Sequence, residues 1–176
     1  AMDKVIVTGG AGFIGSRLVG HLLEETDYQV VNLDKITYAA VGRPVALNEA
    51  APDTATGDAG RYQHDRIDIC DQLAVRSVFE RFQPDAVFHL AAETHVDRSL
   101  DAPTTFFETN VRGSFVLLQE ATRYWSGLTA EARDRFRLIL ISTDEVFGTV
   151  SGDGRFDHKS PYRPNSPYAA TKAAAD

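Results

Sequence analysis

The stretch "KVIVTGGAGFIG", residues 4–15, joins a β-branched apolar run to a glycine-rich turn and the start of a helical pattern. Its glycines Gly9, Gly12 and Gly15 are spaced by three. Glycines placed in this way permit a tight turn, let the backbone approach a pyrophosphate and let the helix pack closely on the strand. The helix N-terminus then offers amides and a positive dipole end to phosphates. A glycine triplet also marks plain turns, but the strand before it and the helix after it favour a dinucleotide site.

Outward from this turn, apolar runs alternate with helical patterns, which is typical of a parallel sheet covered on both faces. We therefore expect an α/β fold with a doubly wound, mostly parallel sheet, forming one domain over residues 1–176. The expected strands are 4–10, 28–34, 61–69, 85–94 and 136–142, and the expected helices are 12–25, 73–82 and 104–125. Segment 39–60 is irregular, and we interpret it as a mobile excursion with a short helix near 45–50.

Composition and charge exclude some classes of function. The net charge of −7 gives no electrostatic footprint for nucleic acid or an anionic membrane. We find no apolar stretch long enough to span a bilayer and no signal-peptide pattern. The single cysteine, Cys70, indicates a reducing compartment, so we expect a cytoplasmic protein. The histidines His21, His64 and His158 are scattered, and we expect no metal site.

Asp34 ends the run "YQVVNLD", about 20 residues after the glycines. An acid there accepts hydrogen bonds from the adenosine ribose, and its charge would repel a 2′-phosphate, so NAD is favoured over NADP. The neighbouring Lys35 and Arg43 leave NADP open, and a plain turn aspartate is the other interpretation. Asp68 and Ile69 end the third expected strand and could flank the adenine, although a solvated strand end explains them equally well.

"STDEVFG", residues 142–148, places Asp144 and Glu145 directly after an apolar strand. Carboxylates are costly there unless they are paired or have a chemical task. Because Ser, Thr and Asp are ordinary turn residues, a solvated turn is the simple alternative.

"NSPYAATK", residues 165–172, puts Tyr168 and Lys172 on one helix face, with Pro167 suited to the first helical position. A neighbouring ammonium, together with the positive nicotinamide, favours the phenolate, which would act as a base near neutral pH. A Tyr–Lys pair at this spacing is also common by chance as a surface pair.

These motifs converge on one edge of the expected sheet. Ligands of doubly wound sheets bind outside the carboxyl ends of the strands. Those ends here are 9–12, Asp34, Asp68, 91–94 and 143–145. We therefore expect the carboxylates of "STDEVFG" to face a cofactor rather than bulk water.

The sequence resembles the extended short-chain dehydrogenase/reductases and, among them, the dTDP-glucose 4,6-dehydratase family. The likeness rests, in order, on "VTGGAGFIGS", "LDKITYA", "IDICD", "HLAAETHVDRSLDAP", "FFETNVRGS", "STDEVFG" and "SPYAATKAAAD". It covers nearly the whole chain and is weakest in 39–60. The resemblance implies a Rossmann-like NAD-binding domain of a lyase that converts dTDP-glucose to dTDP-4-keto-6-deoxyglucose by oxidation, water elimination and reduction.

The resemblance also implies roles for single residues. Tyr168 would take the sugar 4-OH proton while hydride leaves C4 for NAD, and Lys172 would orient the nicotinamide ribose. Glu145 would remove the C5 proton, Asp144 would protonate the departing 6-OH, and Thr143 would hydrogen-bond the 4-oxygen. Two adjacent carboxyls can do opposite work only if their environments separate their pKa values.

By the same resemblance, the residues that bind NAD are spread over these motifs: Gly9, Gly12, Phe13, Ile14, Gly15, Asp34, Lys35, Thr37, Asp68, Ile69, Leu90, Ala91, Ala92, Thr109, Tyr168 and Lys172. Thr94 and Thr143 would contact the nucleotide-sugar substrate. His95 is a candidate because it follows Thr94, whereas His89, inside an apolar strand, is interpreted as a core histidine.

The chain departs from the family at two places. Phe147 stands where the family usually has tyrosine, and the sequence stops at Asp176, within the Tyr168 helix. The family continues with further strands and a sugar-nucleotide domain, so we expect a fragment whose own activity stays open. The alternatives are an epimerase or decarboxylase on the same scaffold, which Asp144 disfavours, and an inactive NAD-binding fragment.

The expected helix 104–125 carries apolar side chains around much of its circumference: Phe106, Phe107, Phe115, Val116 and Leu118. This is more than one core-facing stripe needs. The resemblance pairs this helix and the Tyr168 helix across a two-fold axis, and we expect a homodimer at full length. The base of the sugar nucleotide stays open, because residues that read it would lie mostly beyond Asp176.

Overall fold

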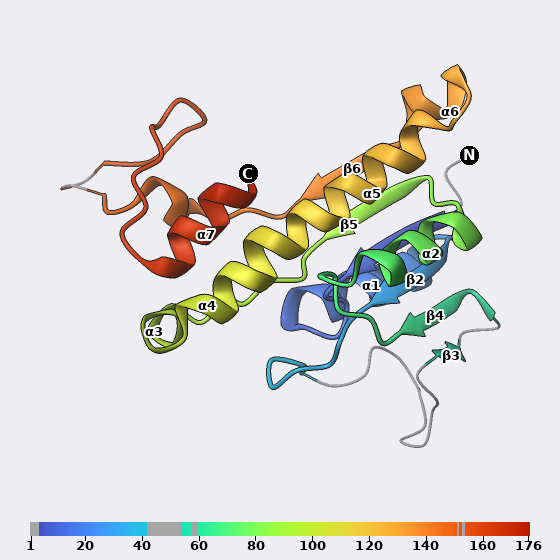
Figure 1. The fold of residues 1–176 in the computed structure, drawn as a ribbon, viewed down its shortest axis with the longest axis horizontal. Helices are drawn as coiled ribbons and strands as arrows, with labels where there is room; N and C mark the ends of the chain where they lie inside the picture. Colours follow the sequence, from blue (N-terminus) through green and yellow to red (C-terminus); the bar gives the residue numbers. More distant parts are fainter. Residues whose placement is uncertain (1–3, 42–53, 58–59, 151, 153) are drawn as a thin grey trace.

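In a computed structural model, described for residues 4–41, 54–57, 60–150, 152 and 154–176, the chain forms a six-stranded sheet with helices on both faces (Figure 1). The strand order is β3-β4-β2-β1-β5-β6, and every pairing is parallel except that of β3 with β4. Without β3, this is the 3-2-1-4-5 order of dinucleotide-binding sheets. The expected α/β fold with a doubly wound, mostly parallel sheet is confirmed.

The strands are shorter than the apolar runs that predicted them. They span Lys4–Thr8 (β1), Gln29–Leu33 (β2), Thr54–Gly57 (β3), Tyr62–Asp65 (β4), Ala86–His89 (β5) and Arg137–Leu140 (β6). The interpretation of 39–60 as an irregular excursion is wrong for β3, which pairs antiparallel along the edge of β4. Its sequence, "TATG", has no apolar alternation to reveal a strand. The short helix expected near 45–50 lies outside the described residues.

The helices confirm the expected positions and add shorter ones. They span Phe13–Glu25 (α1), Gln72–Phe82 (α2), Val96–Asp101 (α3), Pro103–Phe106 (α4), Ser114–Ser126 (α5), Ala130–Arg135 (α6) and Pro167–Ala175 (α7). The expected helix 104–125 runs in one direction (Figure 1) but contains a π-helical segment, η2, at Phe107–Gly113. A 3₁₀ turn, η3, spans Asp144–Phe147.

Side chains that alternate along the strands build a core layer on each face of the sheet. The layer under α1 contains Val5, Val7, Val19, Leu22, Leu23, Val30 and Tyr62. The layer under α2 and α5 contains Ile6, Val31, Leu33, Val75, Val78, Phe79, Val87, Val116, Leu117 and Ala121. Full burial of each such aliphatic side chain stabilises the fold by roughly 1.5–3 kcal/mol before entropy is counted.

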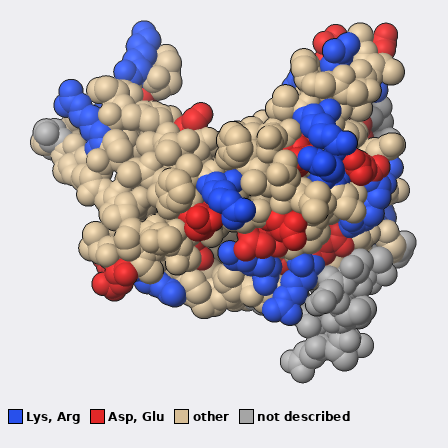
Figure 2. All heavy atoms as spheres, viewed as in Figure 1, with Lys and Arg blue, Asp and Glu red and all other residues tan. Residues whose placement is uncertain are grey.

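Charged side chains join α2 and α5 on their outer sides. The Glu120 carboxylate, 2% exposed, accepts hydrogen bonds from Arg76 Nε at 2.9 Å and Nη2 at 3.0 Å. Hydrogen bonding to Arg76 is the main cause that lowers the pKa of Glu120. The Arg123 guanidinium pairs with the Glu80 carboxylate at 2.8 Å. Figure 2 shows that basic and acidic side chains are intermixed over the right-hand part of this face of the molecule.

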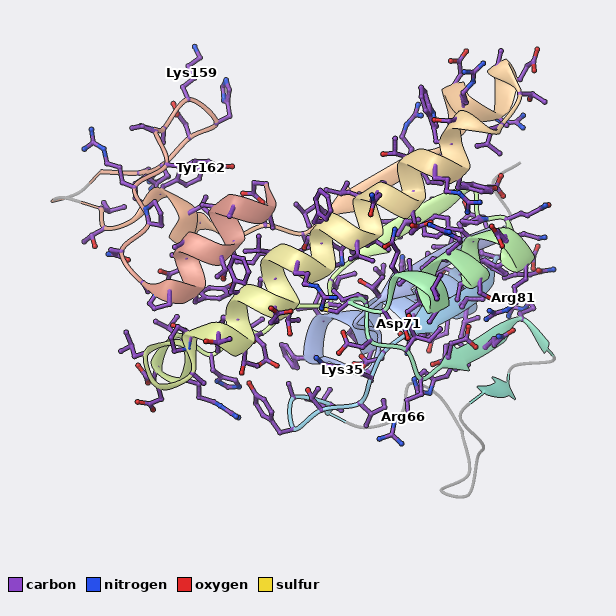
Figure 3. All side chains as sticks on the ribbon, viewed as in Figure 1. Lys35, Arg66, Asp71, Arg81, Lys159 and Tyr162 are labelled. Atoms are coloured by element: carbon purple, nitrogen blue, oxygen red, sulfur yellow. The ribbon has the colours of Figure 1, made fainter. Side chains whose placement is uncertain are left out.

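The chain between η3 and α7 folds back to hold α7 beside the end of β6. Arg163 N donates to Val146 O at 3.0 Å, and the Tyr162 hydroxyl donates to Asp176 Oδ2 at 2.9 Å. Tyr162 and Lys159 lie on this returning segment (Figure 3). The Ser166 hydroxyl then accepts from Ala169 N, which fixes the first turn of α7.

A polar chain crosses the core between β1, β5 and α5. Ala91 N donates to Thr8 Oγ1 at 3.1 Å, Thr8 Oγ1 lies 2.7 Å from His89 Nδ1, and His89 Nε2 lies 2.9 Å from Ser114 Oγ. His89 is 2% exposed, and burial lowers its pKa to about 3, with a smaller effect from the charge of Lys172. The interpretation of His89 as a core histidine is confirmed.

We predict that His89 makes the fold sensitive to acid. Its pKa is about 3 in the folded chain and about 6.5 when unfolded, so unfolding takes up a proton between these values. The stabilisation is complete above ~pH 6.5 and is lost as the pH falls toward 3. In urea titrations, the free energy of unfolding should fall by up to roughly 1.4 kcal/mol per pH unit more steeply in the wild type than in His89→Gln. The exposed-site control His21→Gln should keep the wild-type slope; equal slopes in all three proteins would contradict the prediction.

Candidate functional site

A cavity of about 690 Å³ opens at the carboxyl edge of the sheet, where the strand order reverses between β1 and β5. Doubly wound sheets bind their ligands at this point. All residues expected to bind NAD or to contact substrate line the cavity: Gly9, Gly12, Phe13, Ile14, Gly15, Asp34, Lys35, Thr37, Asp68, Ile69, Leu90, Ala91, Ala92, Thr94, Thr109, Thr143, Tyr168 and Lys172. Their individual roles stay predictions.

The three glycines of the turn after β1 are needed for different structural reasons. Gly9 has φ +72°, and a Cβ there would lie 2.6 Å from Ala91 N. A Cβ on Gly15 would lie 2.1 Å from Gly9 O. On Gly12 it would meet only Gly9 O, at 3.3 Å, so this glycine leaves bare backbone beside the cavity. The N-terminus of α1 has no acidic residue in its first turn, which leaves its dipole available to an anion.

Asp34 joins the glycine turn to the end of β2. Its Oδ2 accepts from Ala11 N at 2.9 Å, and its Oδ1 accepts from Ile36 N at 2.8 Å. A carboxylate has about four acceptor positions, so capacity remains for ribose hydroxyls. Arg43, one of the two basic residues that left NADP as an alternative cofactor in the sequence analysis, lies outside the described residues.

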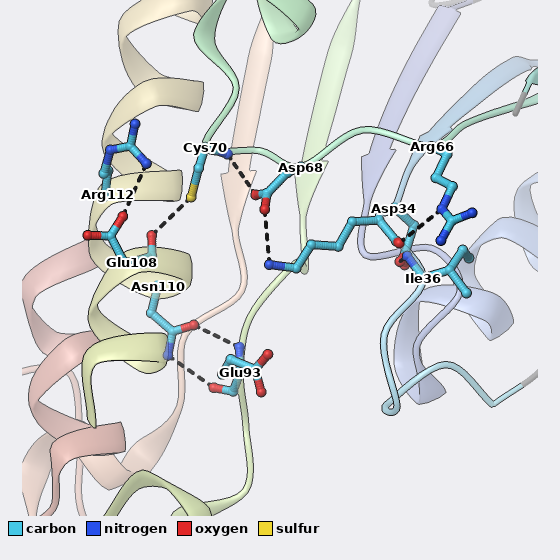
Figure 4. A network of polar contacts seen from close by, with 10 residues as sticks. Asp34, Ile36, Arg66, Asp68, Cys70, Glu93, Glu108, Asn110 and Arg112 are labelled. Carbon is cyan, nitrogen blue, oxygen red and sulfur yellow. Dashed lines mark hydrogen bonds and ion pairs between the residues drawn. The ribbon is translucent and has the colours of Figure 1, made fainter. Parts of the chain in front are cut away.

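Lys35, the other residue that kept NADP open, is paired within the site. Its Nζ lies 3.1 Å from Oδ2 of Asp68, which is labelled in Figure 4. Burial by itself raises the pKa of Asp68, but the Cys70 amide and the Lys35 ammonium together lower it below its ordinary value. The positive charge of Lys35 is therefore already balanced, which weakens the argument for a 2′-phosphate.

Tyr168 and Lys172 both lie on the buried side of α7. Burial raises the pKa of Tyr168; a hydrogen bond with Thr143 opposes this, and the charges of Glu145 and Asp144 add to it. Lys172 Nζ donates to Ile141 O at 2.6 Å, and burial lowers the Lys172 pKa. Burial and the nearby carboxylates raise the pKa of Tyr168 in this structure, and the role expected of Lys172 in favouring the phenolate stays a prediction.

Asp144 and Glu145 lie in η3, which Thr143 caps by accepting from Glu145 N at 3.3 Å. Both side chains are exposed, and neither lines the cavity. The expectation that they face a cofactor therefore finds no support in the lining of the cavity, and their role stays a prediction. They directly follow Thr143, which lines the cavity, so they lie at its rim, and their charges raise the pKa of Tyr168.

The substitution at Phe147 is accommodated by aromatic packing. Its ring centroid lies 5.3 Å from that of Phe156 and 5.4 Å from that of Tyr162. The hydroxyl that a tyrosine would carry is not needed for these contacts.

Sequence analysis missed part of the cavity wall: Leu33, Tyr38, Ala39, Ala40, Val41, Ile67, Glu93, Ile141 and Ser142. Glu93 is 7% exposed. Asn110, in the π-helical segment, accepts from Glu93 N at 2.8 Å and donates to Glu93 O at 3.0 Å (Figure 4). Irregular turns of this kind are frequent at functional sites. The acidic Glu93 within "AAETHVDRS" could have indicated a site residue. Its hydrogen-bond partners could not be foreseen, because they come from distant parts of the chain.

The sequence candidate His95 lines the cavity, and its ring centroid lies 5.8 Å from that of Tyr38. Within the described ranges, we find no group of three or more His, Cys, Asp or Glu side chains that could hold a metal ion. In those same ranges, every helix is too short or too polar to cross a membrane.

A family model described as GDP-mannose 4,6 dehydratase matches residues 6–176. The chain belongs to this family. It is 47% identical, over 99% of its length, to dTDP-glucose 4,6-dehydratase of Neisseria meningitidis serogroup B, and 44% identical, over 98%, to dTDP-glucose 4,6-dehydratase 1 of Escherichia coli K12. These matches cover 47% and 48% of the two relatives, so the chain spans about half the length of the curated relatives it matches.

Two solved structures are similar to this chain in sequence and in fold. One is DesIV, a dTDP-glucose 4,6-dehydratase from Streptomyces venezuelae with NAD and TYD bound. It matches this chain with a TM-score of 0.79 and 38% sequence identity, and the match covers 98% of this chain and 49% of the DesIV chain. The other is a UDP-glucose 4-epimerase of Thermus thermophilus in complex with NAD. It matches with a TM-score of 0.75 and 33% sequence identity, and the match covers 98% of this chain and 48% of the epimerase chain. The resemblance to dTDP-glucose 4,6-dehydratases is confirmed, while the fold alone does not separate dehydratases from epimerases.

We predict that Gly9→Ala lowers the free energy of unfolding by roughly 1–3 kcal/mol, because the new Cβ adds both a left-handed backbone cost and a clash with the β5 loop. Gly20→Ala is the matched control. Gly20 lies inside α1 with nothing within 4 Å of a Cβ, so this change should stabilise the chain by about 0.5–1 kcal/mol. Urea unfolding measures both variants, and a Gly9→Ala protein as stable as the wild type would refute the packing argument.

Proposed function

We propose that residues 1–176 are the NAD-binding domain of a nucleotide-sugar 4,6-dehydratase that converts dTDP-glucose to dTDP-4-keto-6-deoxyglucose. The observation that carries this proposal is the adjacent pair Asp144 and Glu145, which directly follows Thr143 on the wall of the cavity that Tyr168 also lines. Oxidation at C4 needs a base and a cofactor, whereas loss of water needs one further base and one further acid. An epimerase on this scaffold would have no use for two carboxyls next to its tyrosine.

The cavity fits NAD on the evidence of its own residues. The bare backbone of Gly12 and the N-terminus of α1 would hold the pyrophosphate, and Asp34 would hold the adenosine ribose. When bound, NAD accepts a hydride and can return it. Lys172, fixed by Ile141 O, would orient the nicotinamide ribose from the cavity wall.

The chain's own groups would move the protons. Tyr168, hydrogen-bonded to Thr143, would take the proton of the sugar 4-OH. Because burial raises the Tyr168 pKa, the phenolate needs a positive charge nearby, and the nicotinamide ring would supply it. Glu145 would then remove the C5 proton while Asp144 protonates the departing 6-oxygen. These two exposed carboxyls can act oppositely only when water is excluded from one of them, and bound substrate would do this.

We also propose that the complete protein is a homodimer in a reducing, cytoplasmic setting. Phe106 and Val116 are buried, but Phe107, Phe115 and Leu118 are 53%, 62% and 41% exposed on the outer side of η2 and α5. An exposed apolar stripe of this kind favours burial against another surface. The half-buried thiol of Cys70, whose pKa burial raises to about 11, suits a protein that uses no disulfide.

We expect the wild-type chain to bind NAD at least roughly tenfold more tightly than NADP, because Asp34 repels a 2′-phosphate. Asp34→Asn keeps an oxygen for Ala11 N but removes the charge, so it should reduce this preference. Asp27→Ala, at an exposed position, controls for net charge and should leave the preference unchanged. Calorimetric titration of both cofactors measures the ratio; equal affinity of the wild type for NAD and NADP would rule out the role given to Asp34.

The dehydratase proposal is tested in protein expressed from the complete gene. Glu145→Gln leaves Tyr168 intact but cannot accept the C5 proton, so reduced cofactor and a 4-keto sugar should accumulate while water loss slows by roughly 10²–10⁴. Tyr168→Phe should prevent any reduction of the cofactor. Stopped-flow absorbance of reduced nicotinamide, with mass analysis of the sugar, separates the two, and Glu24→Gln serves as an exposed control. Dehydration at the wild-type rate by Glu145→Gln would overturn the assignment.

A further inference from the structure

Residues 36–41, which follow β2, form a strap along the cavity wall. At its start, Ile36 has φ +54°, a left-handed conformation that a β-branched residue adopts at a cost. At its end, Val41 N donates to Ala11 O at 3.0 Å, which returns the strap to the glycine turn. Between these points, Thr37 to Val41 all line the cavity. The strap is therefore a strained excursion tied back to the turn after β1.

Tyr38 connects the strap to the far wall of the cavity. Its hydroxyl donates to Glu93 Oε2 at 2.6 Å, across 55 positions in sequence. The Arg98 guanidinium of α3 lies 3.6 Å from the centroid of the Tyr38 ring. These contacts join the loop after β2 to the loop after β5, so they span the crevice between the two halves of the sheet.

The two ends of this connection differ in how firmly they are held. Glu93 is 7% exposed, and both its backbone amide and its carbonyl are bonded to the Asn110 side chain. Asn110 is 1% exposed and also donates to Thr171 Oγ1 at 3.0 Å. Tyr38 is 49% exposed and lies on the strap. Glu93 is thus the fixed anchor, and Tyr38 is the side that can swing away.

We propose that the hydrogen bond from Tyr38 to Glu93 is a clasp that keeps the strap closed over the bound dinucleotide and slows its exchange. Tyr38 is then a positioning residue that acts through the strap. The inference rests on the proposed function. In that reaction the hydride removed from C4 is returned to C6, so the only net change is loss of water. The same cofactor molecule must stay in place between the two transfers, because its early release would leave an oxidised sugar and no hydride to complete the cycle.

The test uses the 176-residue chain with NADH as the probe. Tyr38→Phe keeps the ring over Arg98 but removes the hydroxyl, so the clasp opens more often. Because a gate acts on entry and exit alike, stopped-flow fluorescence should give association and dissociation rate constants that both rise by roughly tenfold, with Kd changed by less than about threefold. Tyr28→Phe is the matched control, because it also removes one tyrosine hydroxyl but at a position that does not line the cavity; its rate constants should stay within about threefold of the wild type.

A second readout needs no ligand. Without nucleotide, Tyr38→Phe should raise the hydrogen-exchange rate of the Val41 amide by roughly tenfold, because this amide is bonded to Ala11 O only while the strap is closed. Unchanged exchange would overturn the clasp. Unchanged NADH rate constants would also overturn it. A faster dissociation with an unchanged association rate would overturn it as well, because that result would mark Tyr38 as a simple contact to the ligand. If wild-type chain does not bind NADH while the amide responds as expected, the proposed function fails and the clasp holds the strap for another ligand.

Discussion

The β1 turn and the β5 loop meet with no space for a side-chain carbon between them. A Cβ on Gly9 would lie 2.6 Å from Ala91 N, and one on Gly15 would reach the Gly9 carbonyl. This close approach puts the N-terminus of α1 directly beside the loop that leaves β5. The Thr8–His89–Ser114 chain fixes the same junction from inside the core. The cavity and the position of Asp34 depend on this junction, because Gly9 N donates to Leu33 O and Ala11 N donates to Asp34 Oδ2.

Much of this arrangement could be predicted from local patterns. The glycine spacing, the acid after β2 and the Tyr168–Lys172 spacing are signals within a few residues, and the cavity collects all of them. β3 could not be predicted, because it is an edge strand without an apolar face. The partner of Lys172 could not be predicted either, because Ile141 O is a backbone atom whose position depends on how α7 docks against the end of β6.

The exposed position of Asp144 and Glu145 has a different cause. A sequence reports that two carboxyls follow an apolar strand, but not whether a further layer covers them. In this chain they end in a short 3₁₀ turn with solvent on their outer side. The fold is similar to that of both a dehydratase and an epimerase, so the sheet alone does not separate these activities. Function on this scaffold is therefore a property of a few side chains at the strand ends.

The π-helical segment Phe107–Gly113 has a consequence for the evolution of the chain. A π turn accommodates an additional residue by hydrogen bonding i to i+5, so it shifts the phase of the residues before it by about 100° relative to those after it. Deleting one residue there would restore a regular helix, leave the sheet contacts of α5 intact, and rotate Thr109 and Asn110 away from Glu93 and the cavity. A lineage that dropped this residue would lose the hydrogen bonds that join Asn110 to Glu93, and with them the anchor of its cavity wall. The segment is thus a place where a single-codon deletion would reshape the cavity.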